Sequence, residues 1–244
     1  MSKKFPKLDL KLLDTRMVLL RETLRAGRWY PALKLAVAVV ITSMLTFVLA
    51  GSVIESTSIF TISLLPASKE GAAEISLSET ADFASPTTVL GAQGIDNMTN
   101  ISESWLPDDL DNTDGVHNGE SYIAYTFYVR NVGEQACTLT EQINLDSAVL
   151  GADAAVRVRM YRNGVPTTYA KIGADGLPEY ATTPFESEDV ISYNEHPDFK
   201  PGDTLKYTLV IWLEGDDPEC LDNIKGGNVK MSMTFTVQEQ EPQP

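Results

Sequence analysis

The sequence predicts a mainly β fold, namely an antiparallel β-sandwich of the jelly-roll or Greek-key type, preceded by one N-terminal transmembrane or signal helix. Three observations lead to this fold class. Residues 35–54 form an uncharged apolar run. After it, apolar and polar residues alternate in short segments separated by Gly, Pro, Asn and Asp. The charge also changes from basic before the run to acidic after it.

The apolar run, LAVAVVITSMLTFVLAGSVI, holds twenty residues without a charge. At about 1.5 Å per residue, a helix of this length spans roughly 30 Å, which is the thickness of the hydrocarbon core of a bilayer. The run therefore predicts a membrane helix. A cleaved secretory signal is the alternative, because Val48-Leu49-Ala50 is followed by Gly51 and offers small residues suitable for cleavage.

The flanks of the run predict its orientation. Residues 1–34 carry nine Lys and Arg against three acids, whereas the rest of the chain carries ten against 31. Basic flanks remain in the cytoplasm, so residues 55–238 are expected to form an extracellular domain. Trp29 and Tyr30 precede the run closely, where amphipathic rings favour the membrane interface. We expect a single-pass membrane protein, or a secreted one if it is cleaved near Ala50.

The basic tail has a pattern of its own. Leu10, Leu13, Met17, Leu20 and Leu24 recur at spacings of three and four residues and form one apolar stripe of a helix. Such an amphipathic helix either lies on the anionic inner leaflet or docks on a partner, and the alternative is a solvated tail that is helical only near lipid.

Alternation is clearest in two exported segments. Residues 229–237 place Val, Met and Phe on one side and polar residues on the other. Residues 154–161 alternate in the same way, with two Arg and one Tyr on the polar side, and they lead to Asn163-Gly164. That dipeptide is a strong signal for a two-residue hairpin turn.

Two further segments, residues 120–131 and 205–214, carry apolar side chains on both faces, which predicts central strands that are covered on both sides. Weaker strands are expected at residues 58–65, 73–79, 137–143, 166–171 and 188–193. We expect long loops over residues 80–119 and a disordered C-terminal tail over residues 239–244.

Two cysteines, Cys137 and Cys220, lie in the exported part at the ends of predicted strands. An oxidising exterior favours a disulfide between them, which would close a loop of about 84 residues and stabilise the fold by roughly 4 to 5 kcal/mol in the chain-entropy model. Two free buried thiols are the alternative, since a metal site would need more ligands.

The sequence gives little sign of catalysis. Its two histidines, His117 and His196, lie in polar segments that we expect to be loops, and no third metal ligand follows at a suitable spacing. No Gly-rich phosphate loop, Gly-x-Ser-x-Gly elbow or basic aromatic patch occurs, and an acidic exterior repels nucleic acid. We therefore expect neither an enzyme nor a nucleic-acid partner.

Two acidic groups remain as candidate binding sites. The first consists of Asp108, Asp109, Asp111, Asp114 and Glu120, and the second of Glu214, Asp216, Asp217 and Glu219. Carboxylates are the hard oxygen ligands that calcium takes. The first group is not an EF-hand loop, because the sixth position counted from Asp109 is Asp114 and not Gly. Calcium is thus the one cofactor to consider, and solvated acidic loops without an ion are the alternative.

Two stretches carry a resemblance to a known family. FKPGDTLKYTLVIWLEGDDPEC followed by GGNVKMSMTF resembles the C-terminal half of exported proteins related to the TasA and camelysin family of Gram-positive bacteria, most specifically in WLEGDDPEC. HNGESYIAYTFYVRNVGEQACTLTEQI is similar to an early strand pair of that family. The likeness covers about residues 117–237, half of the chain.

The resemblance implies a jelly-roll surface protein and, in some relatives, a secreted subunit of matrix filaments that donates an N-terminal strand to the next subunit. Camelysin itself is described as a metal-dependent protease. No metal-ligand motif of the family matches this chain, so no catalytic residue is carried over. The long basic N terminus departs from the compact signal peptide of the relatives.

These observations predict a non-enzymatic cell-surface or matrix protein with a structural or adhesive function. A camelysin-like peptidase and a calcium-dependent binding module are the alternatives. The expected partners are the lipid bilayer, cell-envelope or matrix components, and further copies of the chain. Self-association would use the β-rich segment 56–65, which either completes its own sheet or adds to the edge of a neighbour's.

Overall fold

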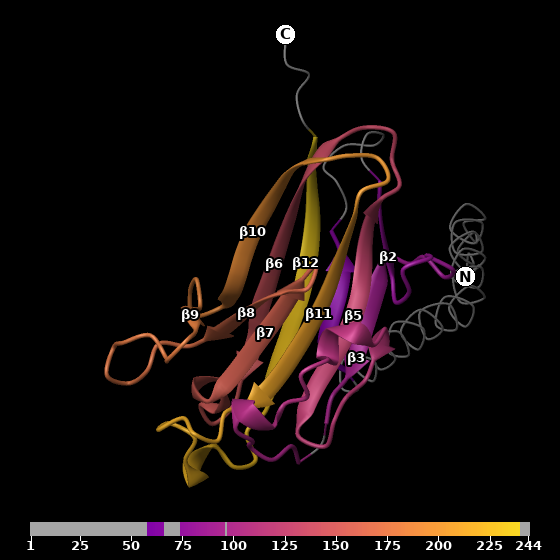
Figure 1. The fold of residues 1–244 in the computed structure, drawn as a ribbon. Coiled ribbons are helices and arrows are strands. Elements are labelled where there is room, and N and C mark those ends of the chain that lie inside the picture. Colours follow the sequence, from indigo (N-terminus) through magenta and orange to yellow (C-terminus); the bar gives the residue numbers. More distant parts are fainter. Residues whose placement is uncertain (1–57, 66–73, 96, 240–244) are drawn as a thin grey trace, which may run out of the picture. The chain divides into compact units, whose positions relative to one another are not determined.

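The computed structural model describes residues 58–65, 74–95 and 97–239, which form two β-sheets (Figure 1). The chain divides into residues 1–56 and 57–244, and all described residues belong to the second unit. A mainly β fold is therefore confirmed for this unit. Its short 3₁₀ helices are η1 (Glu103–Trp105), η2 (Leu110–Asn112), η3 (Ala152–Ala154) and η4 (Asp222–Ile224).

The first sheet has five strands in the order β10-β6-β12-β1-β3. Their bounds are Val190–Phe199 (β10), Cys137–Ala148 (β6), Val229–Glu239 (β12), Ser58–Leu64 (β1) and Val89–Gln93 (β3). β1 runs parallel to β12, with Phe60 opposite Met231, and antiparallel to β3. This sheet is therefore mixed and not purely antiparallel as predicted, because β1 and β12 begin at the same end of the sheet.

The second sheet has seven strands, of which six follow the order β2-β5-β11-β7-β8-β9 and the seventh, β4, pairs with β5. Their bounds are Ile75–Ser78 (β2), Gly115–Val116 (β4), Tyr122–Asn131 (β5), Val156–Arg162 (β7), Val165–Ala170 (β8), Thr183–Pro184 (β9) and Thr204–Leu213 (β11). The predicted hairpin is confirmed. Asn163 (φ 50°) and Gly164 (φ 83°) link β7 to β8, and positive φ at both positions is typical of a type I′ turn.

One hydrophobic core lies between the two sheets. The inward side chains of β5 are the four that alternation predicts, namely Ile123, Tyr125, Phe127 and Val129. Phe127 stacks on Tyr207 of β11 with ring centroids 5.4 Å apart, and it makes an edge contact with Phe235 of β12 at 6.1 Å. Because Phe235 belongs to the other sheet, these aromatic contacts join the two layers.

A smaller apolar layer covers the outer face of the second sheet. Leu106 and Leu110 pack there on Ala124, Val210 and Trp212. β5 and β11 are therefore buried on both faces, as predicted. The covering side chains come from the segment containing η1 and η2, which sequence analysis assigned to long loops.

Several strands differ from their predicted bounds. Residues 80–119 contain β3 and β4, which are too short and exposed to show clear alternation. β10 continues to Phe199, beyond the predicted end at residue 193, through a break in the register at Pro197 and Asp198. β10 is an edge strand, where a proline and a bulge are tolerated.

Other predictions concern residues outside the described part of the chain. They are the amphipathic helix of the basic tail, the apolar run 35–54 with Trp29 and Tyr30, and the C-terminal tail beyond Glu239. Among the described residues, no helix has the length and apolar character needed to cross a bilayer.

Candidate functional site

An open groove lies on the outer face of the second sheet beside η1. One part, of about 610 Å³, is lined by residues 102–104 and 106–108, by side chains of β7, and by residues of the β8–β9 and β11–β12 loops. A second part, of about 520 Å³, lies over β7 and β8. The two parts share Glu103, Arg159 and Tyr161, and we call them together the outer groove. It is the candidate site because it combines a concave surface with many ionisable side chains.

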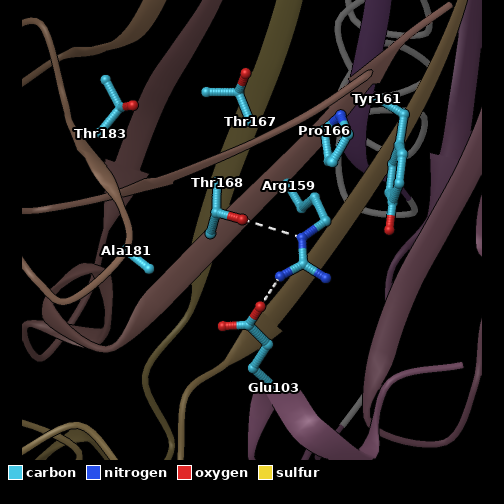
Figure 2. A pocket seen from close by; sticks show the side chains of 8 residues that line it. All are labelled: Glu103, Arg159, Tyr161, Pro166, Thr167, Thr168, Ala181 and Thr183. Carbon is cyan, nitrogen blue, oxygen red and sulfur yellow. Dashed lines mark hydrogen bonds and ion pairs between the residues drawn. The ribbon is translucent and has the colours of Figure 1, made fainter. Parts of the chain in front are cut away.

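An ion pair crosses the outer groove (Figure 2). Arg159 projects from β7 and pairs with Glu103 of η1, while its Nε donates a hydrogen bond of 3.0 Å to Thr168 Oγ1 of β8. The Arg159 guanidinium carbon also lies 5.3 Å from the ring centroid of Trp212. These contacts hold η1 against the sheet, so the arginine has a clear structural role.

The buried side chain of Glu214 fixes the base of the groove. Its Oε2 accepts hydrogen bonds from Trp212 Nε1 (3.0 Å) and from the backbone N–H of Glu103 (3.1 Å). Its Oε1 accepts a third from the backbone N–H of Asp216 (3.2 Å). Three donors satisfy this buried carboxylate, which ties β11 to η1.

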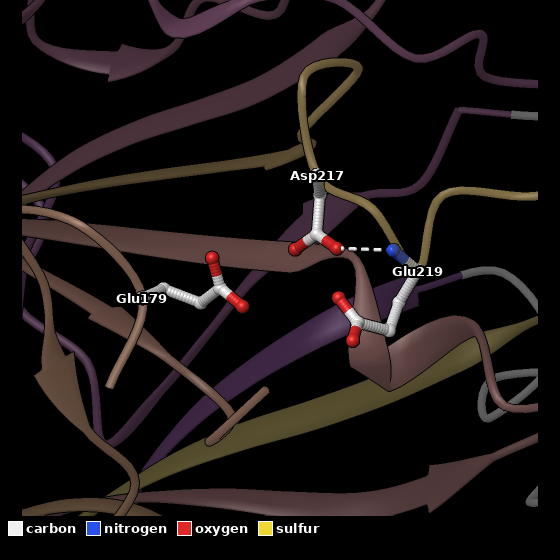
Figure 3. Close-up of side chains that lie close together, drawn as sticks. All are labelled: Glu179, Asp217 and Glu219. Carbon is white, nitrogen blue, oxygen red and sulfur yellow. Dashed lines mark hydrogen bonds between the residues drawn. The ribbon is translucent and has the colours of Figure 1, made fainter. Parts of the chain in front are cut away.

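At one end of the groove, three loop carboxylates gather near one another (Figure 3). Oxygens of Glu179, Asp217 and Glu219 lie within 4.8 Å of one another. Arg157 of β7 joins them, with its Nη2 2.5 Å from Asp217 Oδ2 and 3.3 Å from Glu179 Oε2. We call these four residues the arginine–acid cluster. Because three carboxylates face one guanidinium, the cluster has an excess of acidic groups.

Backbone donors complete the arginine–acid cluster. Asp217 Oδ1 accepts a hydrogen bond from Glu219 N (2.7 Å), and Glu219 Oε1 accepts one from Ala174 N (2.9 Å). Burial and, after it, the charge of Asp217 raise the pKa of Glu179, against the opposing charge of Arg157. Carboxylates grouped in this way suit a divalent cation, but Arg157 already supplies positive charge to two of them.

The first predicted calcium group does not converge. Asp114 accepts a hydrogen bond of 2.7 Å from the Tyr128 hydroxyl, and burial together with this contact raises the pKa of Tyr128 to about 12. The backbone oxygen of Asp111 accepts a hydrogen bond from Lys206. The remaining members, Asp108, Asp109 and Glu120, are exposed. Within the described ranges, the one set of three potential ligands within 4.8 Å is that of the arginine–acid cluster, which contains two members of the second predicted group.

A second ionic group, missed by sequence analysis, lies between the two sheets. Glu141 of β6 occupies an inward position between Leu139 and Ile143 and is fully buried. It pairs with Arg162 of β7 and with His196 Nε2 of β10 at 3.0 Å. We call Glu141, Arg162 and His196 the core ionic network. A glutamate among the inward positions of an alternating strand was the signal available in the sequence.

The core ionic network shifts the titration of its members. Burial acts to raise the pKa of Glu141, but the hydrogen bond from His196 and the charge of Arg162 outweigh it and leave this pKa below its usual value. Burial and the charge of Glu141 raise the pKa of Tyr207, whose hydroxyl lies 3.4 Å from His196 Nε2. The prediction that His196 lies in a polar loop is therefore wrong, since it faces a buried carboxylate from β10.

The predicted disulfide is also wrong in this structure, because Cys137 and Cys220 are not bonded. Cys137 begins β6 opposite Phe199, at the end of the sandwich where β11 starts, whereas Cys220 follows the other end of β11. The ten residues of β11 extend roughly 30 Å, but a disulfide needs Cα atoms within about 7 Å. Burial raises the pKa of both thiols.

The His117 side chain contacts the backbone of the segment that contains η2 and β4. Its Nδ1 lies 2.9 Å from the carbonyl oxygen of Gly115, and its Nε2 lies 2.8 Å from that of Leu110. Both histidines of the chain thus have structural contacts.

Comparison of the chain with models of known protein families and with curated proteins gives no match. The similarity to the TasA and camelysin family therefore remains a resemblance.

Proposed function

We propose that the chain is a non-enzymatic protein of the cell surface, anchored by residues 35–54, whose extracellular sandwich has a structural or adhesive function in the envelope or matrix. The observation that carries the proposal is the position of β1. Three residues separate it from the apolar run, and it pairs on one side with β12 and on the other with β3. A strand held on both sides forms a firm junction between a sandwich and an anchor.

The contacts of the outer groove, of the arginine–acid cluster and of the core ionic network favour this function over that of a peptidase. Arg159 pairs with Glu103, Arg157 pairs with Asp217, and His196 pairs with Glu141. Groups engaged in this way hold elements together, whereas hydrolysis requires a nucleophile, a base and an orienting group directed at one substrate position. The jelly-roll topology implied by the family resemblance agrees with a surface protein.

Protease treatment of intact cells tests the topology. We expect added protease to remove the sandwich and to leave residues 1–34 protected, because the basic flank remains inside. Protection of both parts would contradict the proposal. N-terminal sequencing of the mature protein then separates the two forms, since an anchored chain keeps its basic tail and a secreted one starts near Gly51.

The peptidase alternative is tested with the full chain, casein, and either zinc or calcium. We expect no cleavage above a buffer control. His117→Ala is the suitable variant, because His196→Ala would also remove a partner of the buried Glu141. Metal-dependent turnover that His117→Ala abolishes would replace the structural function by the enzymatic one.

Self-association by strand addition would require β1 to leave its own sheet. We expect a chain that starts at Gly51 to be monomeric, and one that starts at Gly71 to be unstable, because β12 and β3 then lose the strand between them. Added peptide STSIFTISLL should restore the shorter chain. Fibres formed by the longer chain, with β1 paired between subunits, would favour a filament subunit over an anchored domain.

A further inference from the structure

One end of the sandwich combines the start of β1 with several loops. β1 and β12 begin at this end because they are parallel, and Val229 at the start of β12 pairs with Ala148 at the end of β6. Three of the loops at this end are the β6–β7 loop (149–155), the β8–β9 loop (171–182) and the β11–β12 loop (214–228). The stretch around Ile101, which bridges to Glu214, and the β9–β10 loop (185–189) lie at this end as well. We call this region the anchor end.

Polar contacts connect the three loops into one surface. Val149 N donates a hydrogen bond of 2.8 Å to Asn228 O, which joins the first loop to the third. Lys171 Nζ lies 2.6 Å from Asp153 Oδ2 and joins the first loop to the second. The bond between the second and third loops runs from Ala174 to Glu219 in the arginine–acid cluster.

Large apolar side chains are exposed on this connected surface. They are Val149, Leu150, Ile172, Leu177, Tyr180 and Leu221, each about half exposed or more. Single exposed apolar residues are normal on a protein surface, but a group of them on adjoining loops is typical of an interaction site. The anchor end therefore offers apolar side chains that a partner could cover.

The short connection to the apolar run identifies that partner. Residues 55–57 alone separate residue 54 from β1. The four residue steps from residue 54 to Ser58 reach about 14 Å at most, and the headgroup region on each side of a bilayer is roughly 5 to 8 Å thick. In a chain anchored by residues 35–54, the start of β1 therefore lies within about 10 Å of the membrane surface.

We propose that the loops of the anchor end bind the outer surface of the bilayer, with Leu150, Leu177 and Leu221 entering the boundary between headgroups and acyl chains. This inference rests on the proposed anchoring by residues 35–54 and adds a second, separate membrane contact. Burial of apolar side chains drives it. Acidic groups at the same end, such as Asp175 and Asp222, repel anionic headgroups, so binding weakens as the anionic lipid fraction rises and recovers with salt.

The test uses the full chain in phosphatidylcholine vesicles whose acyl chains are brominated near the headgroup, since bromine quenches tryptophan. Leu177→Trp places a reporter at the anchor end, and Val165→Trp places one at the opposite end on a side chain of similar exposure (63% and 67%). After subtraction of the parent signal, we expect the quenching of the Leu177→Trp reporter to be about twofold that of the control or more. Adding Leu150→Ser and Leu221→Ser should about halve it.

Flotation after an alkaline wash measures anchoring separately. If the chain floats while both reporters are quenched equally, the loop contact is overturned and the anchor stands. If the chain does not float, the anchor and the loop contact both fail. Circular dichroism verifies folding of each variant, and Leu221→Trp is a second reporter with the same expected result if Leu177→Trp does not fold.

Discussion

The core ionic network and the arginine–acid cluster use the same kinds of charged group but differ in charge balance and in access to water. In the core, one buried carboxylate, that of Glu141, meets Arg162 and His196. In the cluster, three carboxylates lie near one another beside an open groove, and Arg157 pairs with two of them. The single carboxylate of the core ionic network has two basic partners, whereas the three carboxylates of the arginine–acid cluster share one guanidinium. Substitutions at the two sites should therefore have different effects on stability.

The largest expected effect comes from the core. Glu141→Gln leaves the Arg162 guanidinium without its charged partner, and breaking a buried pair in this way lowers the free energy of unfolding by about 3 to 5 kcal/mol. Urea denaturation of residues 57–244 at neutral pH measures the change. Glu195→Gln is the matched control, because Glu195 is exposed on β10, and it should change stability by less than about 0.5 kcal/mol. Equal effects of the two substitutions would remove the distinction between core and surface acids.

The next effect concerns the only guanidinium of the cluster. Arg157→Gln leaves three adjacent carboxylates with no basic partner in the cluster and should cost about 3 kcal/mol, because the Asp217 side chain is fully buried. Calcium should then raise the melting temperature of the variant, since the ion replaces the lost charge, and it should hardly change the parent chain. Strong stabilisation of the parent by calcium would instead favour the calcium-dependent module.

The two sites should also respond to pH with opposite sign. The pKa of Glu141 is lowered in the folded state, so its contribution to stability is present above the unfolded value of about 4.3 and is lost as the pH falls through the folded pKa. The pKa of Glu179 is raised, so this residue lowers the stability of the folded protein as the pH rises from the unfolded to the folded pKa. As the pH rises to about 5, Glu141→Gln should become increasingly harmful relative to the parent and then level off, whereas Glu179→Gln should become increasingly favourable as the pH rises above about 4. Melting curves between about pH 3.5 and 7 measure both trends, and trends of the same sign would contradict the assignment.

The smallest effect concerns the two thiols. Cys137 is buried in the hydrophobic core, whereas Cys220 lies in the β11–β12 loop at the anchor end. Because of its place in a loop, Cys220→Ser should change the free energy of unfolding by less than about 0.5 kcal/mol. Maleimide should label both thiols of exported, denatured, unreduced protein, but Cys137 should react in the folded chain far more slowly than Cys220. Complete protection of both thiols until a reductant is added would restore the disulfide that the structure lacks.

Features that depend on neighbouring positions in one strand could be predicted from the sequence, whereas contacts between distant segments could not. Alternation alone identified the inward face of β5, because neighbouring positions in one strand decide it. The same rule put Arg157 and Arg159 on the polar face of their strand. It could not bring Glu179 to Asp217, since these acids come from loops 38 positions apart and meet only through the fold. The apolar layer of Leu106 and Leu110 was missed because its 3₁₀ helices are too short to show a period.

The parallel pairing of β1 with β12 has a mechanical consequence. The chain enters β1 at the anchor end, while β12 leads to the opposite end of the sandwich. In a chain anchored by residues 35–54, as proposed, a pulling force between the membrane and that opposite end would act along both strands and load the row of hydrogen bonds between them in shear. Bonds loaded in shear resist together, whereas those of a peeled hairpin break one after another. With the proposed anchoring, the pairing of β1 with β12 is thus oriented to withstand tension.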